Sequence, residues 1–162
     1  MKVAGSVIFI VSVLWVSLGQ TTAKPDLSGV WRLDESRSKV DPSVAEITKD
    51  YVVTIVQKES EIRMTTTYQK EGRNVIEKST YYTDGRHEID LRTGRKVDGS
   101  TTRWRGNKLV RRIASKILDN PPLEAVTIEE WELSADGKTL TLNLTFGGVR
   151  MGKFRYVFNR TS

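Results

Sequence analysis

Apolar and polar residues alternate along most of the chain with a period of two, and helical periodicity is nearly absent after the first twenty residues. In 139–146 the alternation is complete, with leucine and phenylalanine on one face and threonine and asparagine on the other. Segment 152–160 places three aromatic residues on one face. Because successive side chains of a strand point to opposite faces, such segments are predicted to be strands with one buried and one solvent-facing side.

Short turns separate the alternating segments. Asp-Gly and Gly-Asn pairs supply the positive φ that tight hairpin turns require, and they occur here at Asp84-Gly85, Asp98-Gly99, Gly106-Asn107 and Asp136-Gly137. The pattern predicts an all-β, antiparallel up-and-down meander closed into a barrel of eight to ten strands, since closure removes exposed edges. The predicted strands lie near 27–33, 50–57, 61–69, 74–82, 86–91, 100–104, 108–114, 124–133, 139–146 and 152–160.

Two connections are longer than a hairpin turn. Residues 34–49 are expected to contain a short helical turn, which Asp41 or Ser43 could cap. Residues 115–123 contain an Asn-Pro-Pro sequence and are expected to form a loop.

The N-terminal residues have the pattern of a secretory signal peptide. A lysine at position 2 precedes the apolar run 7–16, which is shorter than the roughly 20 residues of a bilayer span. Small residues then allow cleavage after Gly19 or Ala23, so 1–23 is predicted to be removed and 24–162 to form one domain. The alternative is an uncleaved N-terminal anchor. We expect the mature protein to be secreted or periplasmic, without a stable membrane anchor.

Composition limits the chemistry available to the chain. There is no cysteine and one histidine, so neither a disulfide nor a histidine-rich metal site is possible within one chain. The chain also contains no Gly-x-Ser-x-Gly motif and no phosphate-binding glycine loop. We therefore predict no catalytic residues, no metal, no cofactor and no enzymatic activity. The formal net charge of +6 is spread along the chain, apart from a basic cluster over 103–112, and nucleic acid is not an expected partner.

The first predicted strand contains Gly29-Val30-Trp31. A Gly-x-Trp motif on the first strand of an exported all-β domain resembles the opening motif of the calycins, the group that includes lipocalins and fatty-acid-binding proteins. The resemblance implies that Trp31 packs across the closed end of a barrel, under a basic residue from near the last strand. Arg155 and Arg160 are candidates, and Arg160 is favoured because it shares a face with the aromatic residues of 152–160.

The chain is similar more specifically to small exported bacterial proteins with a lipocalin-like domain. The resemblance rests on the order and spacing of several short sequences: Ser28-Gly29-Val30-Trp31-Arg32-Leu33, Tyr82-Thr83-Asp84-Gly85-Arg86, Trp104-Arg105-Gly106-Asn107-Lys108 and Glu130-Trp131-Glu132-Leu133-Ser134-Ala135-Asp136-Gly137.

Strand parity predicts which polar side chains point inward. His87, Arg111 and Glu129 each share a face with apolar neighbours on their predicted strands. Because an isolated buried charge is costly, Arg111 is expected either to receive a ligand carboxylate or to pair with Glu129, unless a bulge moves it to the surface. The residues predicted to line a cavity are Met64, Thr66, Tyr68, His87, Trp104, Arg111, Glu129 and Trp131.

The leading prediction from these patterns is an exported binding protein for a small hydrophobic or amphipathic molecule held in the barrel. The alternative is a non-enzymatic envelope or interaction module with a solid core, acting through a surface such as the basic cluster that includes Arg103, Arg105 and Arg112. The sequence gives no prediction of oligomeric state.

Overall fold

The computed structural model describes residues 24–47, 50–88, 99–117, 123–148 and 151–161. It contains nine strands and two short 3-10 helices within those ranges, η1 (Glu35–Arg37) and η2 (Pro42–Ile47). The strands are β1 (Gly29–Leu33), β2 (Val52–Lys58), β3 (Glu61–Lys70), β4 (Arg73–Tyr82), β5 (Ser100–Arg105), β6 (Lys108–Ile117), β7 (Leu123–Leu133), β8 (Thr139–Gly147) and β9 (Gly152–Arg160).

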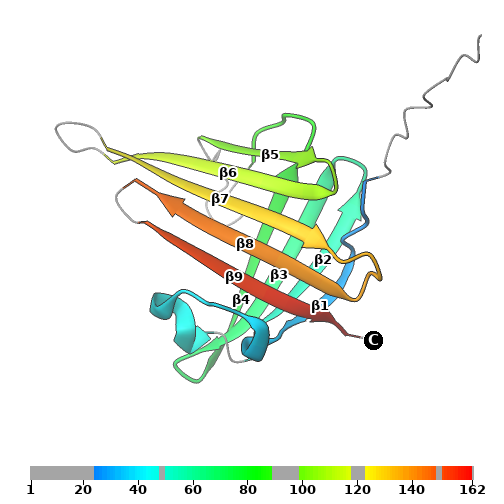
Figure 1. Ribbon diagram of the computed structural model, residues 1–162, viewed down its shortest axis with the longest axis vertical. Coiled ribbons are helices and arrows are strands. Elements are labelled where there is room, and N and C mark those ends of the chain that lie inside the picture. The colour runs from blue at the N-terminus through cyan, green and yellow to red at the C-terminus, as the bar shows by residue number, and fades with distance from the viewer. Residues whose placement is uncertain (1–23, 48–49, 89–98, 118–122, 149–150, 162) are drawn as a thin grey trace, which may run out of the picture.

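All nine strands form one antiparallel sheet in the order β4-β3-β2-β1-β9-β8-β7-β6-β5. The first strand pairs with both the second and the last, with Trp31 opposite Val53 on β2 and opposite Arg160 on β9. The sheet curls so that β5 to β9 cross in front of β2 to β4 (Figure 1). This all-strand half-barrel is consistent with a calycin-like fold.

The two ends of the described sheet are β4 and β5. Closure of the barrel, which the sequence predicts, is therefore not seen among the described strands. The connection between these two strands includes 89–98, which lie outside the described residues.

The hydrophobic core lies inside the curl. Trp31, Ile62, Leu109 and Leu140 are fully buried, and they come from strands on both halves of the sheet. Alternate residues of the same strands face water, as the burial pattern of β1 shows for Val30. The period-two pattern of the sequence therefore produces one buried face around a shared interior.

Most predicted elements agree with the structure. The loop predicted over 115–123 is shorter, because β6 continues to Ile117 and β7 begins at Leu123, and 118–122 lie outside the described residues. The expected strand over 86–91 is not formed at 86–88, and its remainder lies outside the described residues. The predicted helical turn in 34–49 is present as η1 and η2. The side chain of Asp34 caps η1 by accepting a hydrogen bond from the backbone N–H of Arg37, and a cap of η2 by Asp41 or Ser43 stays a prediction.

The predicted signal peptide, residues 1–23, lies outside the described residues. Within the described part of the chain, no helix has the length and apolar character needed to cross a bilayer.

Candidate functional site

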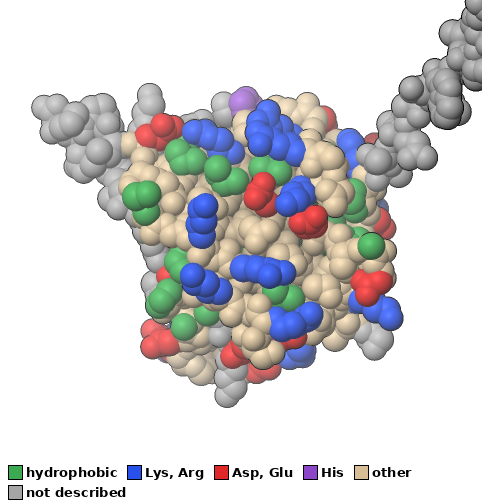
Figure 2. All heavy atoms as spheres, viewed as in Figure 1, with side chains coloured by type: hydrophobic (Ala, Val, Ile, Leu, Met, Phe, Trp, Pro, Cys, Tyr) green, Lys and Arg blue, Asp and Glu red, His purple; other side chains and the backbone are tan. Residues whose placement is uncertain are grey.

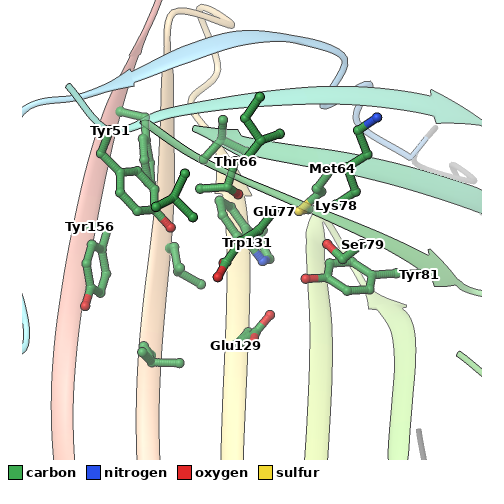
Figure 3. A pocket seen from close by; sticks show the side chains of 16 residues that line it. Tyr51, Met64, Thr66, Glu77, Lys78, Ser79, Tyr81, Glu129, Trp131 and Tyr156 are labelled. Atoms are coloured by element: carbon green, nitrogen blue, oxygen red, sulfur yellow. The ribbon is translucent and has the colours of Figure 1, made fainter. Parts of the chain in front are cut away.

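The half-barrel contains a partly open cavity of about 1100 Å³ between β2–β4 on one side and β7–β9 on the other. Apolar and aromatic side chains make up most of its wall, with a few polar groups among them (Figure 3). The lining residues are Tyr51, Val53, Met64, Thr66, Val75, Ile76, Glu77, Lys78, Ser79, Tyr81, Glu129, Trp131, Leu142, Leu144, Tyr156 and Phe158.

Strand alternation explains why these residues meet. Met64 pairs with Ser79, and Thr66 pairs with Glu77, between β3 and β4. Directly opposed residues of an antiparallel pair point to the same face, so both pairs face the cavity.

The aromatic side chains form a connected wall. The ring of Tyr51 stacks on Tyr68, with their centroids 5.8 Å apart, and lies 6.1 Å from that of Phe158. Phe158 in turn stacks on Trp131 at 6.0 Å. Burial raises the pKa of Tyr51 well above its ordinary value, so this wall presents a neutral hydroxyl at neutral pH.

Arg111 lies behind this wall, in a cluster of buried charges. Its Nη2 lies 2.8 Å from Oε2 of Glu88, and its Nη1 lies 3.1 Å from Oε1 of Glu129. Arg111 and Glu129 are opposite each other in the β6–β7 register. The guanidinium also lies 4.5 Å from the centre of the Tyr81 ring, and Oγ1 of Thr102 donates to Glu88. Of the sequence alternatives for Arg111, pairing with Glu129 is the one present, with Glu88 as a second partner.

Glu129 connects this cluster to the cavity. Burial raises the pKa of its carboxyl group, and the positive charge of Arg111 opposes that rise. The carboxylate points into the cavity near Trp131 (Figure 3). The indole N–H of Trp131 also favours the charged form of Glu129, although its Nε1 is buried without a hydrogen bond of ordinary geometry.

Trp31 on β1 is fully buried and lies under Arg160. Cζ of Arg160 lies 4.3 Å from the centre of the Trp31 ring, which is the arrangement the resemblance implies. Arg160 is fixed there by hydrogen bonds from Nη1 to the Ser28 carbonyl and from Nε to the Gly137 carbonyl. Gly29 leaves room for the guanidinium, because a Cβ at that position would lie 2.7 Å from Nη1 of Arg160.

The cavity contains four of the residues that the sequence predicts for it, namely Met64, Thr66, Glu129 and Trp131. Tyr68 and Arg111 are not among the lining residues, although Tyr68 stacks on Tyr51 and donates a hydrogen bond to Glu77, both of which line the cavity. Trp104 packs against the hydrophobic core without reaching the cavity, and its Nε1 has no hydrogen-bond partner among the described residues.

His87 does not take the inward orientation that the sequence predicts. Its side chain is exposed, and the adjacent Glu88 occupies the buried position. The reason is that residues 86–88 are not in a strand, so the alternation on which the prediction rests does not apply.

Sequence reasoning did not identify three of the tyrosines in the cavity, Tyr51, Tyr81 and Tyr156. Tyr156 could have been found, because it shares a strand face with Phe158. Tyr81 lies at the end of β4, where it has the same parity as Val75 and Ser79.

The outer face of β6 to β9 carries lysine and arginine side chains with acidic side chains among them (Figure 2). Arg103, Arg105 and Arg112 of the basic cluster are exposed. Arg112 pairs with Glu124, and Lys108 pairs with Glu132. The basic cluster is thus partly neutralised by carboxylates of the neighbouring strand β7.

No set of three or more potential metal-ligating side chains is gathered in the described ranges. In comparisons with known proteins, no family model matches the chain, and no curated protein matches it significantly.

Proposed function

We propose that this protein is an exported, lipocalin-like binding protein that holds a small hydrophobic or amphipathic molecule inside its half-barrel. The observation that carries the proposal is the cavity of about 1100 Å³, which is of the size and mixed apolar and polar character typical of small-molecule sites. A solid core would have filled this space with side chains.

The polar groups of the cavity also support a binding role. Glu129 and the hydroxyl groups of Tyr51 and Tyr81 belong to side chains that line a largely apolar wall. A few polar groups in an apolar pocket are what orients a bound small molecule. In this proposal the N-terminal 1–23 directs export, and binding requires no catalytic step, metal or cofactor.

The proposal is tested by filling the cavity from one strand. Thr66 lines the cavity, whereas Thr65 alternates to the opposite face of β3. Thr66→Trp would therefore occupy ligand space, and Thr65→Trp is a matched control with the same added volume on the outer face.

The measurement is a titration of the purified proteins with N-phenyl-1-naphthylamine, an uncharged probe whose fluorescence increases in apolar surroundings. We expect one molecule to bind per chain with a micromolar Kd, at least tenfold weaker binding by Thr66→Trp, and wild-type binding by Thr65→Trp. Absence of binding by the wild-type protein, or an equal effect of both substitutions, would refute the proposal.

A further inference from the structure

The charges that line the cavity are mainly negative. Glu129 points inward from β7, and Glu77 faces inward from β4 opposite Thr66. The only cationic lining residue among those described is Lys78, which comes from an exposed position and extends away from Glu129 (Figure 3). The charge of the cavity lining is therefore opposite in sign to that of the whole chain, whose formal net charge is +6.

Within the part of the chain that the structure describes, no buried cation remains for an incoming anion. Arg111 lies close to the cavity wall through its contact with Glu129. Both edges of its guanidinium group are already bound, one by Glu88 and the other by Glu129. A ligand carboxylate could reach Arg111 only by displacing one of these buried carboxylates, which would then lack a counter-charge.

Among the described residues, the buried cluster has one fewer positive than negative side chain. It contains one guanidinium, Arg111, and two carboxylates, whose side chains are 3% and 15% exposed. Burial opposes ionisation of Glu129, and a second cation placed in the cavity beside it would stabilise the ionised form.

The aromatic wall provides a second attraction for positive charge. The faces of tyrosine and tryptophan rings attract cations, and Tyr51, Tyr81, Trp131 and Tyr156 all line the cavity. The described residues already contain such contacts: Arg86 lies over Tyr82, Arg160 lies over Trp31, and Arg111 lies over Tyr81 of the cavity wall.

From the carboxylates, the aromatic wall and the engaged Arg111, we infer that the cavity selects amphipathic molecules with a cationic head group, which lies beside Glu129 while the apolar tail contacts residues such as Val53, Leu142 and Leu144. This inference rests on the proposed function, and it specifies the class of ligand that the cavity takes.

The test compares three probes with nearly the same alkyl chain and different head groups: decyltrimethylammonium, decanol and decanoate. Each displaces N-phenyl-1-naphthylamine from the purified protein below its micelle concentration. We expect decyltrimethylammonium to bind at least tenfold more tightly than decanol, and decanoate to bind most weakly. The preference for the cation should fall as the pH is lowered and Glu129 becomes protonated, because the quaternary ammonium keeps its charge.

Two variants test whether Glu129 produces the preference for the cationic probe. Glu129→Gln should reduce the affinity for decyltrimethylammonium about tenfold and leave that for decanol unchanged. Glu132→Gln, on the same strand but paired with Lys108 on the outside, is the matched control and should change neither. If Glu129→Gln does not fold, Glu77→Gln at an exposed position tests the same charge effect and should also weaken binding of the cation.

The outcomes separate this inference from the proposed function. Equal binding of all three probes, tightest binding of decanoate, or an equal effect of Glu129→Gln and Glu132→Gln would overturn cation selection while leaving a binding protein. If neither the naphthylamine nor any decyl probe binds, the proposed function fails, and this inference fails with it.

Discussion

Replacing Arg111 with methionine would leave two buried carboxylates without their counter-charge. Both of its contacts are direct, at 2.8 Å to Glu88 and 3.1 Å to Glu129, and the arginine side chain is 13% exposed. Removing one partner of such a buried ion pair typically costs about 3–5 kcal/mol of the free energy of unfolding. We therefore expect Arg111→Met to lower the free energy of unfolding at neutral pH by about 3–5 kcal/mol.

The pH dependence of this cost identifies its cause. Without Arg111, the pKa of Glu129, which burial already raises, would rise further, and acidification would neutralise this carboxyl group in the folded protein. The destabilisation of Arg111→Met should then be smaller at about pH 5 than at about pH 8.

The assay is urea unfolding followed by tryptophan fluorescence. Arg112→Met is the matched control, since Arg112 is the next residue on β6 but is exposed and lies 3.6 Å from an exposed carboxylate oxygen of Glu124. An exposed pair contributes about 0–1 kcal/mol. The reasoning would be refuted if the two substitutions had equal effects, or if the cost of Arg111→Met did not change with pH.

Two further predictions concern Gly29 and Glu129. Gly29 has a φ of +149° and a Cβ there would meet Arg160, so Gly29→Ala should lower the free energy of unfolding by about 1–3 kcal/mol or more. Thermal unfolding should show that Gly29→Ala destabilises the protein more than Gly85→Ala, because φ at Gly85 is also positive, at +88°, but the space around it is open. Equal destabilisation by the two substitutions would contradict the role of Arg160. Burial raises the pKa of Glu129 above 4.5, so the folded state holds its proton more tightly and the stability from this group falls as the pH rises through the folded pKa. Urea unfolding should accordingly show that the free energy of unfolding of Glu129→Gln, relative to that of the wild type, increases from about pH 5 to about pH 8. A difference between the two proteins that does not change with pH would contradict the raised pKa of Glu129.

The sequence predicts the sheet well because alternation and turn residues are local signals. Met64, Thr66 and Trp131 were placed inward by parity alone, and each lies on a regular strand that lines the cavity. The same rule fails at His87 because residues 86–88 do not form a strand, and it therefore also misses the buried Glu88. A period-two pattern predicts the face to which a side chain points only where the residues form a strand.

The cavity itself could not be predicted from the sequence. Its volume depends on how far β2–β4 stand from β7–β9, and that separation depends on contacts between residues far apart in the chain. The engagement of Arg111 by two carboxylates is also a product of this packing, since Glu88 and Arg111 are brought together from a loop and a strand. The sequence therefore left open whether Arg111 meets a ligand or a structural partner, and only the fold distinguishes the two.

The most direct test of a ligand-binding interior is a crystal structure of the protein grown with decyltrimethylammonium. The account predicts density for one molecule inside the half-barrel, with its head group beside Glu129 and its alkyl chain against the apolar wall. An interior closed by Tyr51, Met64 and Trp131, with no space for a ligand and none bound, would contradict it.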